Sequence, residues 1–315
     1  MDEFLTYSPE RVIDLNLRES AQRFLRVCRQ EHLHLRDLAE EVAKTPLDPQ
    51  ELLASLPDRT PDPFLEESEG EGPTVKGIQA LHAAALKVLF ATELCRALEQ
   101  RIPFFPALFF GEPSELSESA AGLVLYQKSS FADEAYLGFA KHVEGLHAQY
   151  ASSFSHACED VYNGLCEYCI LPVFNTSEGP LGSFYRLIDR YDLKIVATCT
   201  ARAAEGSPET TFALLRRELL PNEPLLAKHE SRYLAFTLTE GSDPVAARLL
   251  AAAELCGLSP EAVDTTLPSE AGESISLRYT LSVANGDLSS FLLYLAMDAP
   301  HYRPLGLYAH LGHET

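Results

Sequence analysis

The side chains with the clearest chemical potential form a short polar run after the apolar segment 169–174: Asn175, Thr176, Ser177, Glu178 and Gly179. The apolar segment predicts a buried strand, and the pattern after residue 181 predicts a helix. Ligands bind beyond the carboxyl ends of parallel strands, and the free N–H groups of a helix start favour a carboxylate. The polar run therefore predicts a small-anion site. Simple capping of the helix by Thr176 or Ser177 is the structural alternative.

A carboxylate ligand also needs cations, and two candidates lie at predicted strand ends. Lys128 follows the apolar segment 123–126, and Arg232 follows Ser231 at the start of a later strand. An arginine can clamp a carboxylate with two parallel hydrogen bonds. The hydroxyl of Thr176 or Ser231 can donate a proton to a leaving group.

The overall charge restricts the classes of partner. The chain has 25 Lys and Arg against 46 Asp and Glu, a net charge of −21, which disfavours nucleic acid and anionic membrane surfaces. Any anionic ligand then requires a local cluster of cations. We find no run of about 18 apolar residues that would predict a membrane span, and the N-terminus lacks a signal-peptide pattern. We therefore expect a cytoplasmic protein that binds neither nucleic acid nor membrane.

The seven cysteines are scattered, which predicts free thiols. Cys166 and Cys169 form a CxxC, but Cys169 opens an apolar run, which indicates buried thiols rather than a redox pair. We expect no metal site and no cofactor.

The elements that must position these residues fall into three regions. Residues 9–56 and 77–101 have helical patterns, and the acidic, Pro- and Gly-rich segment 57–76 between them predicts a linker. Strands and helices alternate over 123–198, which predicts a parallel sheet covered on both faces. Residues 200–228 look loop-rich, with one helix expected over Thr210–Leu220.

The last region has six elements in the order βαββαβ, which is the ferredoxin-like split βαβ arrangement. We expect strands at 231–238, 262–267, 274–283 and 303–311, and helices at 244–256 and 288–297.

Several motifs, taken in order, resemble the bifunctional chorismate mutase/prephenate dehydratase family. Residues 171–179, Leu-Pro-Val-Phe-Asn-Thr-Ser-Glu-Gly, are similar to its Pro-Ile-Glu-Asn-Ser-x-x-Gly motif, and Ser231-Arg232-Tyr233 is similar to its Thr-Arg-Phe motif. The helix ending at residue 100 is similar to the last helix of the family's chorismate mutase module. The βαββαβ block at 229–312 resembles its ACT regulatory domain.

This resemblance implies three modules: a chorismate-mutase-like helical module over 1–102, a prephenate-dehydratase-like α/β lobe of periplasmic-binding-protein type over 122–228, and an ACT-like domain over 229–315. It implies a homodimer assembled through the ACT-like block, with a small carboxylate or amino acid as ligand. The implied residues divide into three roles: proton donors Thr176 and Ser231; substrate-binding Asn175, Ser177, Gly179, Arg232 and Lys128; and regulatory-ligand residues Gly241, Asp243 and Pro268.

The chain also departs from the family pattern. The Gly- and Ser-rich turn after the family's first strand is here Lys128-Ser129-Ser130-Phe131-Ala132, and the Glu before Asn175 is Phe174. The 200–228 segment is too short for the family's second lobe, which would need at least about 50 residues. Two hypotheses follow. The chain is either a shortened prephenate dehydratase of phenylalanine biosynthesis, or a catalytically degenerate ACT-domain protein that senses an amino acid or related metabolite.

Overall fold

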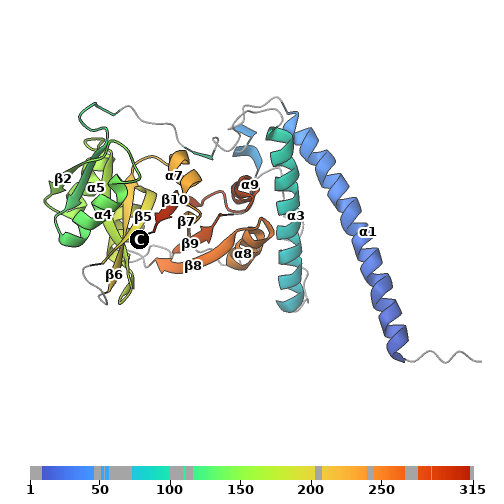
Figure 1. Ribbon diagram of the computed structural model, residues 1–315. Coiled ribbons are helices and arrows are strands. Elements are labelled where there is room, and N and C mark those ends of the chain that lie inside the picture. Colours follow the sequence, from blue (N-terminus) through green and yellow to red (C-terminus); the bar gives the residue numbers. More distant parts are fainter. Residues whose placement is uncertain are drawn as a thin grey trace, which may run out of the picture.

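The computed structural model describes most of the chain, namely residues 9–45, 51–52, 54–56, 73–99, 109–110, 116–202, 208–239, 245–266, 276–284 and 286–312. For residues 9–16, 73–76, 245 and 266 it describes the backbone alone. The fold combines N-terminal helices with one mixed α/β sheet (Figure 1).

The α/β lobe follows the alternation expected from the sequence. Its elements are β1 (Leu123–Gln127), α4 (Ser130–Ala140), β2 (His147–Ala151), α5 (Phe154–Tyr162), β3 (Tyr168–Asn175), β4 (Gly179–Pro180), α6 (Gly182–Arg190), β5 (Lys194–Arg202), β6 (Glu209–Arg216) and α7 (Glu223–Lys228). Because neighbouring residues of a strand face opposite sides, Val124 and Tyr126 pack under α4, whereas Leu125 packs under α5 and α6.

One expected helix is a strand. Instead of a helix over Thr210–Leu220, the chain forms β6, antiparallel to both β3 and β5. Phe212 and Leu214 enter the core beneath α4, and Ala213 and Leu215 enter the core on the other face. A strand buried on both faces reads as a continuous apolar run, which periodicity alone does not distinguish from a helix. The expected all-parallel sheet is therefore mixed.

The C-terminal region has the predicted βαββαβ order. Its elements are β7 (Arg232–Thr239), α8 (Val245–Leu255), β8 (Ser259–Thr266), β9 (Ser276–Ser282), α9 (Leu288–Asp298) and β10 (Arg303–Leu311). The antiparallel strand order β10-β7-β9-β8 confirms the ferredoxin-like arrangement. Strand β10 also pairs in parallel with β5, so the sheet runs unbroken as β2-β1-β3-β6-β5-β10-β7-β9-β8.

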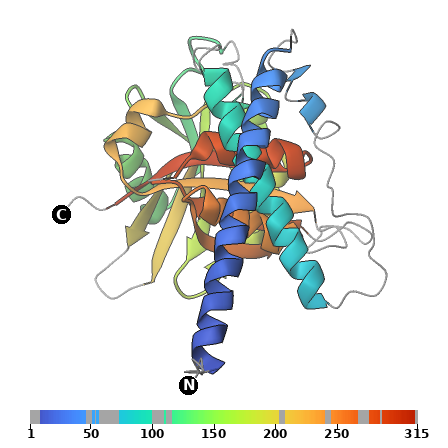
Figure 2. The ribbon, with the colours of Figure 1, turned by 90° about the vertical axis from the view of Figure 1, so that its right-hand side faces the viewer.

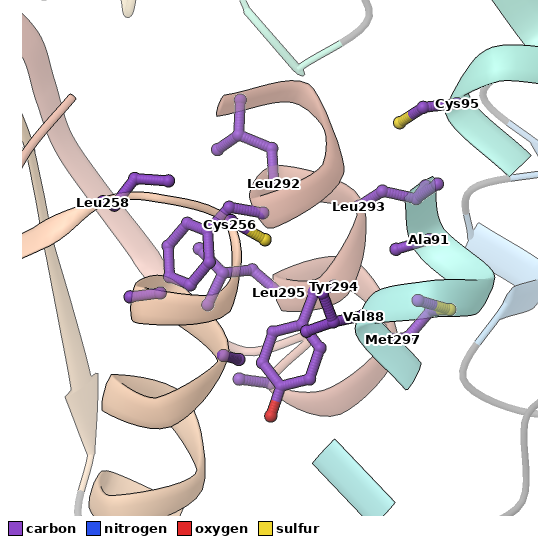
Figure 3. Packing of buried hydrophobic residues seen from close by; sticks show 14 of the residues in the cluster. Val88, Ala91, Cys95, Cys256, Leu258, Leu292, Leu293, Tyr294, Leu295 and Met297 are labelled. Carbon is purple, nitrogen blue, oxygen red and sulfur yellow. The ribbon is translucent and has the colours of Figure 1, made fainter. Parts of the chain in front are cut away.

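Two long helices precede the sheet: α1 (Pro9–Ala43) and α3 (Pro73–Glu99). Helix α3 packs against α8 and α9, where Val88, Ala91 and Cys95 meet Leu293 and Met297 (Figure 3). Helix α1 lies across α3 (Figure 2). By length and mean hydropathy, 1.3 over Gly77–Glu99, α3 is apolar enough to cross a membrane, contrary to the sequence-based expectation. The helix nevertheless buries Leu94 and its neighbours within the chain's own core.

The cysteines behave as expected. All seven are free, and all but Cys28 are buried. Burial raises the pKa of Cys166 to about 12, so this thiol of the CxxC stays protonated and unreactive at neutral pH.

Candidate functional site

The α/β lobe has a topological switch point between β1 and β3. From the carboxyl end of β1 the chain passes through α4 to β2 on one side, and from β3 it passes through α6 to β5 on the other. Helices α4 and α6 cover opposite faces of the sheet. Open α/β sheets bind ligands in the crevice at such a point. Lys128 follows β1 and Asn175 ends β3, the two parallel strands that flank this crevice.

The amide of Asn175 makes three hydrogen bonds, one to β6 and two within its own turn. Its Nδ2 donates to Thr210 Oγ1 on β6 at 2.9 Å. Its Oδ1 accepts from the Ser177 backbone N–H at 2.9 Å and from Ser177 Oγ at 2.5 Å. The predicted substrate donors Asn175 and Ser177 thus bond to each other and to β6.

Thr176 extends the same network to the start of β6. Its hydroxyl oxygen accepts from the Glu209 N–H, and its own N–H donates to the Glu209 carbonyl, both at 3.0 Å. Gly179 has φ of 79°, a left-handed conformation that favours glycine. The turn closes the hairpin between β3 and β4, so these residues have clear structural roles.

The helix after the turn is displaced from it. Helix α6 begins at Gly182, after β4, and the residue before it is Leu181, whose side chain has no hydrogen-bonding atom. Neither Thr176 nor Ser177 caps this helix, which corrects the capping alternative. The N-terminus of α6 is also not continuous with the Asn-Thr-Ser turn, because β4 lies between them. The predicted small-anion site stays a prediction.

A tyrosine–aspartate cluster, which no sequence motif indicates, forms the β1 side of the crevice. The hydroxyls of Tyr126 and Tyr150 donate to Asp133 Oδ1 at 3.0 and 3.3 Å. The Lys128 ammonium lies 5.0 Å from the Tyr150 ring centroid, a cation–π contact. Ser129 caps α4 by accepting from the Ala132 N–H at 3.1 Å. Tyr126 and Tyr150 face each other in the register of β1 and β2, a pairing that follows from the fold and that no motif of the sequence indicates.

This cluster is poorly suited to an anionic ligand. Burial and the hydrogen bond to the Asp133 carboxylate raise the pKa of Tyr126 well above its usual range, so the phenol stays protonated. Asp133 places a negative charge in the first turn of α4, where it offsets the positive end of the helix dipole. Nearby, Arg202 is ion-paired with Glu209. Lys128, exposed at the end of β1, is the cation that the crevice offers among the residues described above.

The other predicted pair, Ser231 and Arg232, lies far from the turn. Three strands, β6, β5 and β10, separate β3 from β7, which places Arg232 at least about 19 Å from Asn175 at the usual strand spacing. The Arg232 guanidinium donates to the Ala284 carbonyl, and the Ser231 carbonyl accepts from the His310 N–H at 2.9 Å. The fold therefore places Lys128 and the Asn-Thr-Ser turn after neighbouring strands, and it holds Ser231 and Arg232 apart from both.

The predicted regulatory residues Gly241, Asp243 and Pro268 lie outside the described residues, so their predicted role stays a prediction. A cavity of about 430 Å³ lies elsewhere, between α4 and the ends of β5 and β10. Glu134, Lys141 and Thr200 line it, together with Cys199 beneath. The predicted site residues are not among its described lining residues.

Comparison with known proteins gives a limited match. The family model described as prephenate dehydratase matches residues 124–205. No curated protein matches the chain.

Solved structures resemble the chain only distantly. A prephenate dehydratase from Streptococcus mutans is 18% identical, with a TM-score of 0.47, and the match covers 60% of this chain and 98% of that one. A prephenate dehydratase from Arthrobacter aurescens, described as a complex with L-Phe, is 12% identical, with a TM-score of 0.45 and coverage of 59% and 90%. GqqA, described as a novel type of quorum quenching acylase, is 15% identical, with a TM-score of 0.45 and coverage of 60% and 95%. The segment that matches the prephenate dehydratase model thus extends from β1 to the end of β5 and contains the crevice between β1 and β3.

Proposed function

We propose that this chain is a non-catalytic, prephenate-dehydratase-like protein that binds an amino acid or a related small carboxylate. The α/β lobe supplies the scaffold, and the βαββαβ block supplies the regulatory ligand site. This is the second of the two hypotheses from the sequence, and the arrangement of the cations favours it.

One observation carries the proposal: the groups expected to act together are held apart by the sheet. Conversion of prephenate to phenylpyruvate expels hydroxide and carbon dioxide from a dianion, which requires a proton donor and cations for two carboxylates. Here Thr176 and Arg232 are separated by three strands. A packed sheet does not bring these positions together by side-chain rotation alone, because strands β6, β5 and β10 fill the space between them.

The local hydrogen bonds support the same conclusion. Asn175, Thr176 and Ser177 engage one another and β6. A ligand at this turn would have to displace those bonds, and each displaced polar group would need a new partner. The crevice also carries the Asp133 carboxylate, which would repel a dianion.

Dehydratase activity is the alternative, and the family-model match over 124–205 favours it. A turnover assay distinguishes the two functions. Purified full-length chain is given prephenate, and phenylpyruvate is followed against a no-protein control, because prephenate also decomposes without catalysis. The proposal predicts the background rate. Phenylpyruvate formation above background that is lost in Thr176→Ala and Arg232→Ala would establish the enzyme instead.

The ligand is tested by thermal unfolding. Any ligand that binds only the native state raises the melting temperature in a concentration-dependent way. Phenylalanine is the first compound to test, because it is the end product of the pathway that the resemblance implies; tyrosine, tryptophan and prephenate follow. A saturable rise with one amino acid and none with prephenate supports the proposal. No rise with any of them contradicts the ligand-binding part of it.

A further inference from the structure

The cavity between α4 and the ends of β5 and β10 lies where the α/β lobe meets the βαββαβ block. Its volume of about 430 Å³ is within the range of small-ligand pockets, about 300–1,000 Å³. Helix α4 forms one wall, and Cys199 of β5 and Leu311 of β10, both buried, lie at its floor. Because β5 belongs to the lobe and pairs in parallel with β10 of the block, a molecule bound in this cavity contacts both modules.

The wall formed by α4 has a defined order of chemical groups. Glu134, Leu137, Gly138 and Lys141 line the cavity at the i, i+3, i+4, i+7 spacing that places side chains on one face of a helix. This face begins with a carboxylate, continues through an apolar stretch and ends with an ammonium group. At a rise of about 1.5 Å per residue, Glu134 and Lys141 lie about 10 Å apart along the helix axis.

The floor between these two charges is neutral and bare. A Cβ atom at Gly138 would already touch Cys199 Sγ at 3.5 Å, so a larger side chain at this position would occupy the floor of the cavity. Burial, together with the negative charge of Glu134, raises the pKa of Cys199 to about 12. The thiol therefore stays protonated at neutral pH and offers an apolar surface to a ligand.

The two charged side chains on this wall are not neutralised by the described part of the chain. Among the described residues, neither the Glu134 carboxylate nor the Lys141 ammonium has a hydrogen-bond or ion-pair partner. Glu134 is half-buried, and a carboxylate that loses hydration without gaining a partner is destabilising. At the Lys141 end, the ring of His142 packs edge-on against that of His229, with 4.9 Å between centroids, which fixes the position of this end of the cavity.

We propose that this cavity binds an elongated zwitterion, a molecule with an ammonium group and a carboxylate at opposite ends of a mostly apolar body about 10 Å long. The ammonium group of the ligand pairs with Glu134, and its carboxylate pairs with Lys141. An extended peptide of about three residues has this length, at about 3.3–3.6 Å per residue, and so does a straight ω-amino acid. The site shares no residue with the Asn-Thr-Ser turn or with the predicted regulatory residues, so this proposal does not rest on the proposed function.

The charges of the cavity disfavour other classes of ligand. A dianion such as prephenate would face the Glu134 carboxylate, and the net charge of −21 adds to that repulsion. A simple cation would face the Lys141 ammonium in the same way. A single α-amino acid carries both charges on one carbon, so it reaches only one of the two side chains at a time. An elongated zwitterion pairs with both.

The test is isothermal titration calorimetry of the full-length chain with tri-alanine, N-acetylated tri-alanine, the C-terminal amide of tri-alanine, and 8-aminooctanoate. Tri-alanine should bind, and each capped form should bind at least about tenfold more weakly, because each cap removes one charge-assisted hydrogen bond. The ω-amino acid distinguishes the two sources of the ligand. If 8-aminooctanoate binds as tightly as tri-alanine, the charge spacing alone is recognised; if it binds more weakly, the peptide groups are recognised as well.

Two variants assign the ends of the ligand. Glu134→Gln should lose the preference for tri-alanine over its N-acetylated form and keep the preference over the amide, whereas Lys141→Met should do the reverse. Glu159→Gln on α5 and Lys228→Met on α7 are the matched controls, since both side chains are exposed and neither lines the cavity. The controls should keep both preferences, and all four variants should unfold at the melting temperature of wild type.

A wild-type chain that binds neither tri-alanine nor 8-aminooctanoate at millimolar concentration overturns the proposal. Binding that is indifferent to capping at either end overturns it too, and so do preferences that survive unchanged in Glu134→Gln and Lys141→Met. Free alanine that competes as well as tri-alanine would show that the separation of the charges is not recognised. None of these results decides the thermal-unfolding test with aromatic amino acids, so the two proposals can fail separately.

Discussion

The crevice between β1 and β3 and the junction of α3 with α8 and α9 differ in what their polar groups do. At the crevice, exposed polar side chains bond to one another, as Asn175 does to Ser177. At the junction, polar side chains join separate segments, as Lys87 of α3 does to Asp298 of α9 at 2.5 Å. The contrast shows that this chain uses its buried polar groups to hold the modules together, while the groups at the expected catalytic position maintain a local turn.

The junction and the crevice also differ in how deeply their aromatic side chains are buried. Phe291 of α9 is fully buried, whereas Phe174, beside the Asn-Thr-Ser turn, is 39% exposed. Where the dehydratase motif has a Glu, an apolar side chain faces solvent. The position of Phe291 is therefore under strong packing constraint, and the position of Phe174 is not.

The largest expected effect comes from removing a core aromatic at the junction. Phe291→Ala should lower the free energy of unfolding by about 3–5 kcal/mol, because it removes a fully buried ring and leaves a cavity. Chemical denaturation measures this loss. Phe174→Ala is the matched control and should cost less than about 1 kcal/mol. Equal losses at the two positions would contradict the comparison.

The next effect comes from the buried ion pair. Lys87→Met should cost about 3 kcal/mol, because it leaves the Asp298 carboxylate buried without its ammonium partner. Lys128→Met, at the crevice, should change stability by less than about 0.5 kcal/mol. Chemical denaturation of both variants at neutral pH measures the two changes in the free energy of unfolding. A larger loss of stability for Lys128→Met than for Lys87→Met would contradict this account.

The ion pair also gives a pH dependence with a defined sign. Burial raises the pKa of Asp298, but the Lys87 ammonium and the Tyr294 hydroxyl outweigh it and hold the pKa below its usual value. A carboxyl group with a lowered folded pKa contributes stability above its unfolded pKa of about 3.9 and loses it as pH falls through the folded pKa. The stability difference between wild type and Lys87→Met should therefore be largest at neutral pH and shrink below about pH 4. A difference that is constant down to acidic pH would contradict this account.

The sequence predicted most of the fold because its patterns were local. Strands β1, β2, β3 and β5 of the α/β lobe and all six elements of the βαββαβ block follow from periodicity and turn chemistry. Strand β6 was not predicted because a strand that is buried on both faces shows no alternation of polar and apolar residues. Its pairing with β5 depends on tertiary structure, which local sequence patterns do not encode.

The candidate site was less predictable, because it depends on strand order. The motifs at Asn175 and Arg232 are each recognisable in the sequence, but their separation follows from three strands that lie between them in the sheet. Two of those strands, β5 and β6, are adjacent in the chain, and the third, β10, comes from its last residues. Periodicity gives no information about such an order.

The smallest effect tests whether the Asn-Thr-Ser turn is structural. Asn175→Ala should lower the free energy of unfolding by about 1–2 kcal/mol, because it removes the bonds to Thr210 and Ser177 and leaves their partners unpaired. The amino acid that stabilises wild type should raise the melting temperature of this variant by the same amount as it raises that of wild type. A variant of wild-type stability that no longer responds to the ligand would show instead that Asn175 binds it.

The separation of the two motifs is the central claim, and a distance between spin labels tests it most directly. Glu178→Cys and Ser231→Cys place nitroxides at exposed positions in a Cys28→Ser background, because the other six cysteines are buried. Pulsed electron–electron double resonance should give a distance of at least about 19 Å between the two nitroxides, set by four strand spacings. The distance distribution should not change when prephenate is added. A population that moves to a much shorter distance with prephenate would show that the fold does bring Thr176 and Arg232 together, and would contradict the account.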